Sequence, residues 1–203
     1  MKDVLSDYEN IFSDLSRIDI KEKYKFLEAV LPEKWIEWYQ ETNPTVTNIL
    51  QFNDYGFEFL YDCSSELVNK GILSLDESIE DRVVVVYGKS QASSRKRDSS
   101  RIRGFLGKSM NEKWNDDTDK GHFIGHALGG GLDVNLFPQS KEINRGLSKR
   151  GKVFRAMERY CYKNPGTFCF SRPIYGDYSW RPFMLEYGLL NKAGDLWVER
   201  FEN

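Results

Sequence analysis

Long hydrophobic runs are missing from this sequence, and no apolar stretch is long enough to span a bilayer. Its first residues also lack the basic region and apolar stretch of a signal peptide. Cysteine is scarce, with three in 203 residues and no metal-site spacing, which argues against a disulfide framework. We therefore expect no membrane partner, and either a cytoplasmic location or export by a dedicated secretion system without a classical signal peptide.

The remaining composition is that of a folded globular protein, with 40% hydrophobic and 14% aromatic residues. Charge is low in total but unevenly distributed. The net charge is -2, yet residues 1–81 carry 7 Lys and Arg against 18 Asp and Glu, whereas residues 82–203 carry 22 against 13. A basic segment of this kind is expected of a protein that binds a phosphate backbone. The acidic segment either restrains or docks the basic part, or is an ordinary support packed against it.

Helical periodicity dominates the first eighty residues. Large apolar residues recur at spacings of three and four among acidic ones: Leu27, Val30, Leu31, Trp35, Trp38 and Tyr39. We expect Pro32 at a helix start, where its missing N–H is tolerated. A second helix is expected around Phe57 to Leu67, ending near Gly71 as a C-cap. The sequence thus predicts an acidic helical module over residues 1–81.

The character of the sequence changes at Arg82, where four consecutive valines predict a buried strand, and we place a domain boundary there. The polar stretch that follows is either a basic loop that contacts phosphate, with Arg101 and Arg103 as candidates, or a solvated linker. From Thr167 onward, strand-like alternation separated by turns predicts antiparallel sheet. The expected fold class is α+β, with the helical module followed by a basic domain over residues 82–203.

Both histidines of the chain, His122 and His126, fall within one short run that also holds aspartates. A neutral imidazole can take a proton from water at physiological pH, which hydrolysis of a phosphodiester requires. A hard cation such as Mg2+ can neutralise the charge that grows on phosphorus, and it accepts one or two protein oxygens while keeping most of its waters. Lys120 and nearby arginines can also neutralise phosphate charge. The run therefore looks like a functional site, and its residue types meet the demands of phosphodiester hydrolysis.

At these residues the sequence resembles the DNA/RNA non-specific endonuclease family of the ββα-metal (His-Me finger) superfamily. The family's Asp-Arg-Gly-His signature corresponds to residues 119–122, with Lys120 in place of Arg. Its Asn-Leu-x-Pro-Gln motif corresponds to residues 135–139. The resemblance covers about residues 83–203 and implies a ββα-metal nuclease core; the first eighty residues match no family we can name.

The resemblance also implies roles for individual residues. His122 is the general base and Lys120 the cation beside it. Asn144 binds the metal, and Glu158 binds it through water and assists catalysis, although the spacing between these two exceeds the family's. The implied cofactor is Mg2+, with Mn2+ as the alternative, and the implied substrate is DNA, with RNA left open. The candidate substrate-binding residues are Arg101, Arg103 and Arg145.

The closest resemblance is to nuclease domains at the C-terminal ends of bacterial polymorphic toxins, which share the final Pro-x-Tyr and Arg-Pro elements, here at residues 173–175 and 181–182. This implies a toxin with a cognate immunity protein; a defence effector or a phage-related nuclease is the alternative. A catalytically silent nucleic-acid-binding or protein-interaction module with the same fold is the competing function.

Three features of this run have simpler interpretations. His126 could join His122 in a zinc site if both lay on one helix, but the glycines between them disfavour a helix. The three glycines at 129–131 favour a turn over a phosphate-binding loop, because no Gly-Lys-Ser/Thr follows. Asn135 is expected to pin this loop with its amide rather than to bind metal.

Overall fold

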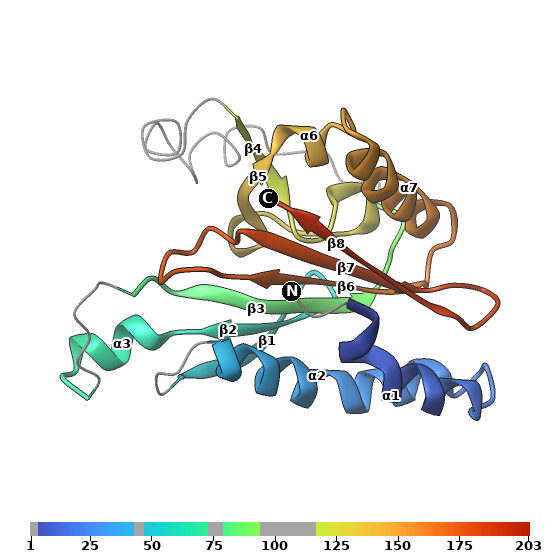
Figure 1. Ribbon diagram of the computed structural model, residues 1–203, viewed down its shortest axis with the longest axis horizontal. Helices are drawn as coiled ribbons and strands as arrows, with labels where there is room; N and C mark the ends of the chain where they lie inside the picture. The colour runs from blue at the N-terminus through green and yellow to red at the C-terminus, as the bar shows by residue number, and fades with distance from the viewer. Residues whose placement is uncertain (1–3, 43–46, 73–78, 94–116) are drawn as a thin grey trace.

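The computed structural model describes residues 4–42, 47–72, 79–93 and 117–203, with side chains from Asp7 onward. A central antiparallel sheet is covered by helices on one face and by a smaller unit of strands and helices on the other (Figure 1). The expected α+β class is therefore confirmed. Within the described residues, no helix combines the length and apolar character that crossing a membrane requires.

The sheet has six strands in the order β1-β2-β3-β6-β7-β8, and every neighbouring pair is antiparallel. Its strands are β1 (Ile49–Asp54), β2 (Phe57–Asp62), β3 (Arg82–Lys89), β6 (Phe168–Ile174), β7 (Met184–Leu190) and β8 (Leu196–Glu202). The valine-rich β3 is buried on both faces, which explains its unbroken apolar run. The strands expected after Thr167 are confirmed.

Residues 57–62 form strand β2, so the helix expected there is wrong. Phe57 and Phe59 enter the core on one side of the sheet and Leu60 enters the other, which is the alternation of a strand. Tyr55 and Gly56 have φ values of 54° and 83°, the two positive angles of a tight hairpin turn. Only a short helix, α3 (Ser64–Asn69), follows.

Strands β2 and β3 pair across the position at which the sequence placed a domain boundary. Tyr61 lies opposite Val83, and Asp62 lies opposite Arg82. Residues 1–81 thus contribute β1 and β2 to the same sheet as the strands of residues 82–203. The boundary expected near Arg82 falls inside this sheet.

Helices α1 (Val4–Ser16) and α2 (Lys23–Thr42) cover one face of the sheet (Figure 1). The buried stripe of α2 follows the periodicity seen in the sequence: Leu27, Leu31, Trp35 and Tyr39. Pro32 lies inside α2 rather than at its start, so that expectation is wrong. Pro32 is not part of the stripe, and packing of the stripe on the sheet outweighs the single backbone hydrogen bond that proline removes.

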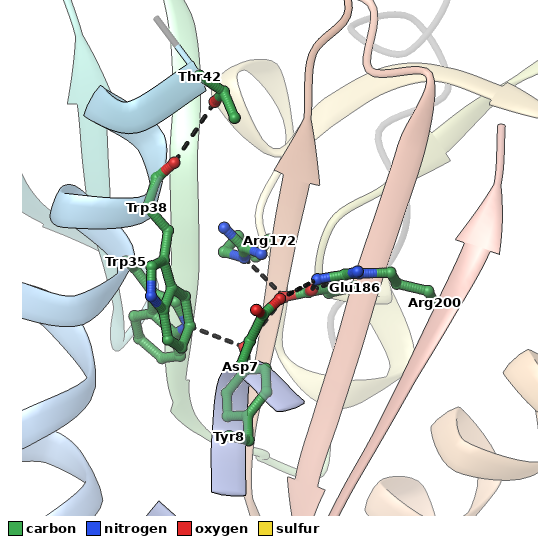
Figure 2. A network of polar contacts seen from close by, with 8 residues as sticks. All are labelled: Asp7, Tyr8, Trp35, Trp38, Thr42, Arg172, Glu186 and Arg200. Atoms are coloured by element: carbon green, nitrogen blue, oxygen red, sulfur yellow. Dashed lines mark hydrogen bonds and ion pairs between the residues drawn. The ribbon is translucent and has the colours of Figure 1, made fainter. Parts of the chain in front are cut away.

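A buried charge network fastens α1 to the sheet (Figure 2). Glu186 of β7 is fully buried and accepts hydrogen bonds from Arg172 Nε at 2.6 Å and Arg200 Nε at 2.7 Å. Two residues of α1 join it, since Tyr8 OH donates to Glu186 at 3.0 Å and Asp7 pairs with Arg200 at 2.6 Å. Burial alone would raise the pKa of Glu186, but the two guanidiniums hold this pKa below its ordinary value.

The other face of the sheet carries a strand-strand-helix unit (Figure 1). Its elements are β4 (Thr118–His122), the 3-10 turns η1 (His126–Leu128) and η2 (Asp133–Asn135), β5 (Leu136–Ser140), α6 (Lys141–Asn144) and α7 (Lys149–Lys163). The buried side of α7, with Phe154 and Met157, shares one core with Tyr187 and Phe201 of the sheet. All candidate site residues that the structure describes belong to this unit.

Candidate active site

A cavity of about 330 Å3 opens where β4, the loop after it, α6 and α7 meet. Its lining combines imidazole, amide, carboxylate and guanidinium groups: His122, Gly125, His126, Ala127, Leu128, Asn144, Arg155, Glu158, Arg159 and Tyr162. Helices α1 and α2 pack on the opposite face of the sheet from the unit that forms this cavity.

His122 is the last residue of β4, which pairs with β5 over its whole length. Gly121 lies opposite Phe137, and a Cβ atom at Gly121 would lie 2.3 Å from Oε1 of Gln139. A glycine is therefore needed directly before the histidine, because any side chain would collide with the neighbouring strand. Just after His122, the ring of Phe123 stacks on that of Phe137 with centroids 4.3 Å apart, which anchors the strand end in the core.

The loop from Ile124 to Gly131 is held by the buried amide of Asn135. Its Oδ1 accepts from the Ile124 N–H at 3.0 Å, and its Nδ2 donates to the carbonyl oxygens of Ile124 at 2.8 Å and Gly131 at 2.9 Å. A Cβ atom at Gly130 would lie 1.9 Å from the Ile124 oxygen, so the loop closes only with glycine there. The structural role expected of Asn135 is confirmed.

Asn144, at the end of α6, is oriented by Asp119 of β4. Its Nδ2 donates to Asp119 Oδ2 at 3.1 Å, so the oxygen end of the amide points away from Asp119. Arg145 holds the same carboxylate with both arms of its guanidinium, at 2.6 Å each. These bonds, the Arg145 pair foremost, lower the pKa of Asp119 below its ordinary value. A charged Asp119 is thus kept as a fixed acceptor for Asn144.

Helix α7 presents one face to the cavity. Arg155, Glu158, Arg159 and Tyr162 are spaced by three and four residues, the spacing of neighbours on a helix surface. Arg155 Nη1 lies 2.6 Å from Glu158 Oε2. The other carboxylate oxygen lies against Gly125, where an added Cβ atom would be only 2.9 Å away. Glu158 is therefore held between the loop and its own helix.

The structure distributes the candidate residues unevenly. His122, Asn144 and Glu158 line one cavity, together with His126. Lys120 is not among the lining residues, and burial lowers its pKa below the ordinary value.

Among the candidate substrate-binding arginines, Arg145 is also absent from the cavity lining, because its guanidinium is engaged by Asp119. Arg101 and Arg103 lie outside the described residues. The cations that do line the cavity are Arg155 and Arg159, which the sequence analysis did not single out. Glu158 and Arg159 follow Arg155 by three and four residues on one helix, and this spacing was the signal that could have found the two arginines.

The oxygen donors at the cavity suit a hard divalent cation. Among the described residues, no three His, Cys, Asp or Glu side chains are grouped as metal ligands. The cavity instead offers one amide oxygen, from Asn144, and one carboxylate, from Glu158. Mg2+ takes one or two protein oxygens and keeps several waters, so this donor set fits it better than it fits the closed tetrahedral set of structural zinc.

No family model matches the chain, and no curated protein matches it. Among solved structures it is similar to one described as the Sda1 nuclease with bound zinc ion. That similarity has a TM-score of 0.42 and 15% sequence identity, and it covers 82% of this chain and 93% of the other. A similarity of this size carries no inference about activity, metal or substrate.

Proposed function

We propose that this protein is a metal-dependent endonuclease that hydrolyses phosphodiester bonds of DNA with little sequence specificity, with RNA as the alternative substrate. The observation that carries this proposal is the single cavity lined by the imidazole of His122, the amide of Asn144, the carboxylate of Glu158 and two arginines. These groups come from three separate elements, β4, α6 and α7, and they are the groups that the chemistry of phosphodiester hydrolysis needs.

Each group has a separate task in this proposal. His122 takes the proton from the attacking water, since an imidazole is a proton acceptor near neutral pH. Asn144 and Glu158 hold the cation, directly or through water. When bound, the cation neutralises charge on the scissile phosphate and its leaving oxygen. Arg155 and Arg159 add positive charge at the cavity wall.

Asp119 and Arg145 act as positioning residues. The hydrogen bond from Asn144 to Asp119 fixes which end of the amide faces away from β4, and Arg145 keeps Asp119 charged and in place. Arg145 is thereby assigned to the support of the site, and phosphate contact passes to the arginines of α7. The biological setting that we propose is that of a bacterial toxin or defence effector with an inhibitor protein, and the toxin-domain resemblance of residues 83–203 supports it.

The first prediction concerns His122. We expect His122→Ala to lower plasmid cleavage on the order of a hundredfold or more while the protein stays folded, because the proton acceptor is lost. Wild-type cleavage should require Mg2+ or Mn2+ and stop in EDTA. The measurement is a plasmid-nicking time course with each ion, alongside a circular dichroism melt.

His126→Ala is the matched comparison, because His126 lines the same cavity. It should retain at least about ten times the activity of His122→Ala, since the motif places the base at residue 122. The reverse order would assign the base to His126. Nucleic-acid binding without cleavage at any metal concentration would instead support a silent binding module.

A further inference from the structure

Glu158 is the ion-pair partner of Arg155, and it is also the carboxylate proposed to hold the divalent cation. The carboxylate of Glu158 is largely buried, with its side chain 14% exposed, whereas that of Arg155 is 53% exposed. The pair is close, with Nη1 and Oε2 2.6 Å apart. In the protein alone, the guanidinium therefore occupies one oxygen of the carboxylate that is proposed to bind the metal.

Binding of the Arg155 guanidinium and of a divalent ion to the same oxygen of Glu158 is electrostatically unfavourable. A divalent ion at Glu158 attracts the carboxylate more strongly than a guanidinium does, and it repels a guanidinium held beside it. Arg155 is the partner that can move, because most of its side chain is in solvent, while Glu158 is confined by Gly125. Metal binding at Glu158 should thus release the guanidinium into the cavity.

A phosphodiester entering the cavity offers the released guanidinium a new partner. Arg binds phosphate with two parallel hydrogen bonds, as it binds a carboxylate. The other cations assigned by sequence are less suited, because Lys120 does not line the cavity and Arg145 is engaged by Asp119. Arg159 also lines the cavity, and no ion pair of Arg159 with a described carboxylate is seen.

We infer that Arg155 alternates between two partners: it neutralises Glu158 in the metal-free protein and moves to the scissile phosphate when a divalent cation binds. This inference rests on the proposed function and deepens it, since it makes one residue both a competitor of the metal and a substrate ligand.

The test begins with the metal alone. Mn2+ binding is followed by the loss of the free-ion electron paramagnetic resonance signal, without nucleic acid, and Mg2+ is measured by competition. Arg155→Ala should bind Mn2+ about two- to fivefold more tightly than wild type, the range expected for losing a competing, half-exposed ion pair. Arg159→Ala is the matched control, with the same charge removed one turn away, and its effect should be smaller than that of Arg155→Ala.

Cleavage gives the second readout. At saturating metal, Arg155→Ala should cut plasmid at least about tenfold more slowly than wild type, because a cation that contacts the phosphate is gone. Arg155→Lys keeps the charge but not the two-armed geometry, so it should recover wild-type Mn2+ affinity and only part of the rate. Tighter metal binding with slower cleavage is the signature that a merely structural ion pair would not produce.

Two results would overturn the inference. Unchanged or weaker Mn2+ binding in Arg155→Ala would show that the guanidinium does not compete with the metal, and wild-type cleavage rates would show that it does not contact the phosphate. Failure of the proposed function is distinguishable from both, because the wild-type protein itself would then not cut plasmid with any divalent ion.

Discussion

At the scale of single residues, the buried carboxylate of Glu186 is balanced by several partners at once. It faces two guanidiniums and a tyrosine hydroxyl and is 0% exposed. Removing one member of such a cluster leaves the others charged and without full compensation inside the protein. The cluster therefore makes residue 186 sensitive to substitution although it is not among the residues that line the cavity.

We expect Glu186→Gln to lower the free energy of unfolding by about 3 kcal/mol at neutral pH. The folded pKa of Glu186 lies below its ordinary value, so the stabilisation is present above that ordinary value and is lost as the pH falls through the lower folded pKa. The variant should therefore lose less stability on acidification than wild type. Urea unfolding at neutral and acidic pH measures both effects, and equal acid sensitivity of the two proteins would contradict the assignment.

Some of the residues predicted from the sequence line the cavity and others do not, for definable physical reasons. His122 and Asn135 lie in short motifs whose spacing fixes their geometry, so their positions followed from the chain alone. Lys120 and Arg145 were chosen for charge, but charge does not say which way a side chain points. Arg145 is held by Asp119, whose position in space depends on how β4 pairs with β5. Arg155 becomes a cavity residue only once α7 is oriented by its buried face.

At the scale of elements, the close approach of α6 and α7 determines where Asn144 lies relative to Glu158. Gly151, in the first turn of α7, makes this approach possible. A Cβ atom there would lie 2.1 Å from the carbonyl oxygen of Glu142 and 3.0 Å from Gly146 Cα. The Gly151 N–H also donates to the N-cap Ser148 Oγ at 3.0 Å. The helix start and the metal-site geometry thus depend on one glycine.

We expect Gly151→Ala to destabilise the protein, which is the opposite of the usual effect of replacing glycine by alanine within a helix. Glycine to alanine within a helix normally stabilises by about 0.5–1 kcal/mol, but here the methyl group meets backbone and should destabilise by about 1–3 kcal/mol. Displacing α6 should also weaken Mn2+ binding at Asn144. Lys152, the next residue, is exposed, so Lys152→Ala is the control. It should change neither the stability nor the affinity for Mn2+. Thermal melts and Mn2+ titrations measure the two effects. A Gly151→Ala variant more stable than wild type would contradict the close approach of α6 and α7.

Element boundaries in the first eighty residues show where sequence periodicity falls short. Phe57, Leu60 and Leu67 match a helical spacing by coincidence, because a strand and a short helix follow each other there. The turn at Tyr55 and Gly56 was the local signal for a hairpin. Pro32 was misleading as a sign of a helix start, since tertiary packing of α2 overrides local propensity. The valine run and the last three strands were predictable because their pattern allows few alternatives.

At the scale of the whole molecule, the acidic N-terminal part and the basic part share cores rather than meet as separate bodies. Val84, Val85 and Tyr87 of β3 lie in one buried cluster with Leu31 and Trp35 of α2. Helices α1 and α2 of the acidic part lie on the face of the sheet opposite the cavity-forming unit (Figure 1). This arrangement indicates that these helices support the sheet rather than cover the cavity.

A protein beginning at Arg82 should therefore be insoluble or unfolded, because β3 would lose both β2 and the helical layer that buries it. Far-UV circular dichroism and size-exclusion chromatography measure this outcome. Variants of exposed acidic residues distinguish structural support from restraint as the role of the acidic part. The double variant Glu9→Gln, Glu33→Gln removes acidic charge at exposed positions and leaves the core unchanged. Their cleavage rate should equal that of wild type. A folded truncated protein that binds DNA more tightly and cuts it faster would instead establish restraint by the acidic part.

The place of α7 in the order of the chain has a consequence for the cell that makes this protein. The helix packs against β7 and β8, which the ribosome adds only after the helix itself is complete. Until those strands emerge, α7 can pack on α6 and η1 but lacks the part of its core that Tyr187 and Phe201 supply. We therefore expect Glu158 and Arg155 not to be held firmly in the cavity that His122 lines. For the proposed nuclease, a growing chain would be inert toward the messenger RNA and nucleoid around it. Cleavage of the producing cell's own nucleic acid would begin only when folding is complete. An inhibitor would have to be present from that point.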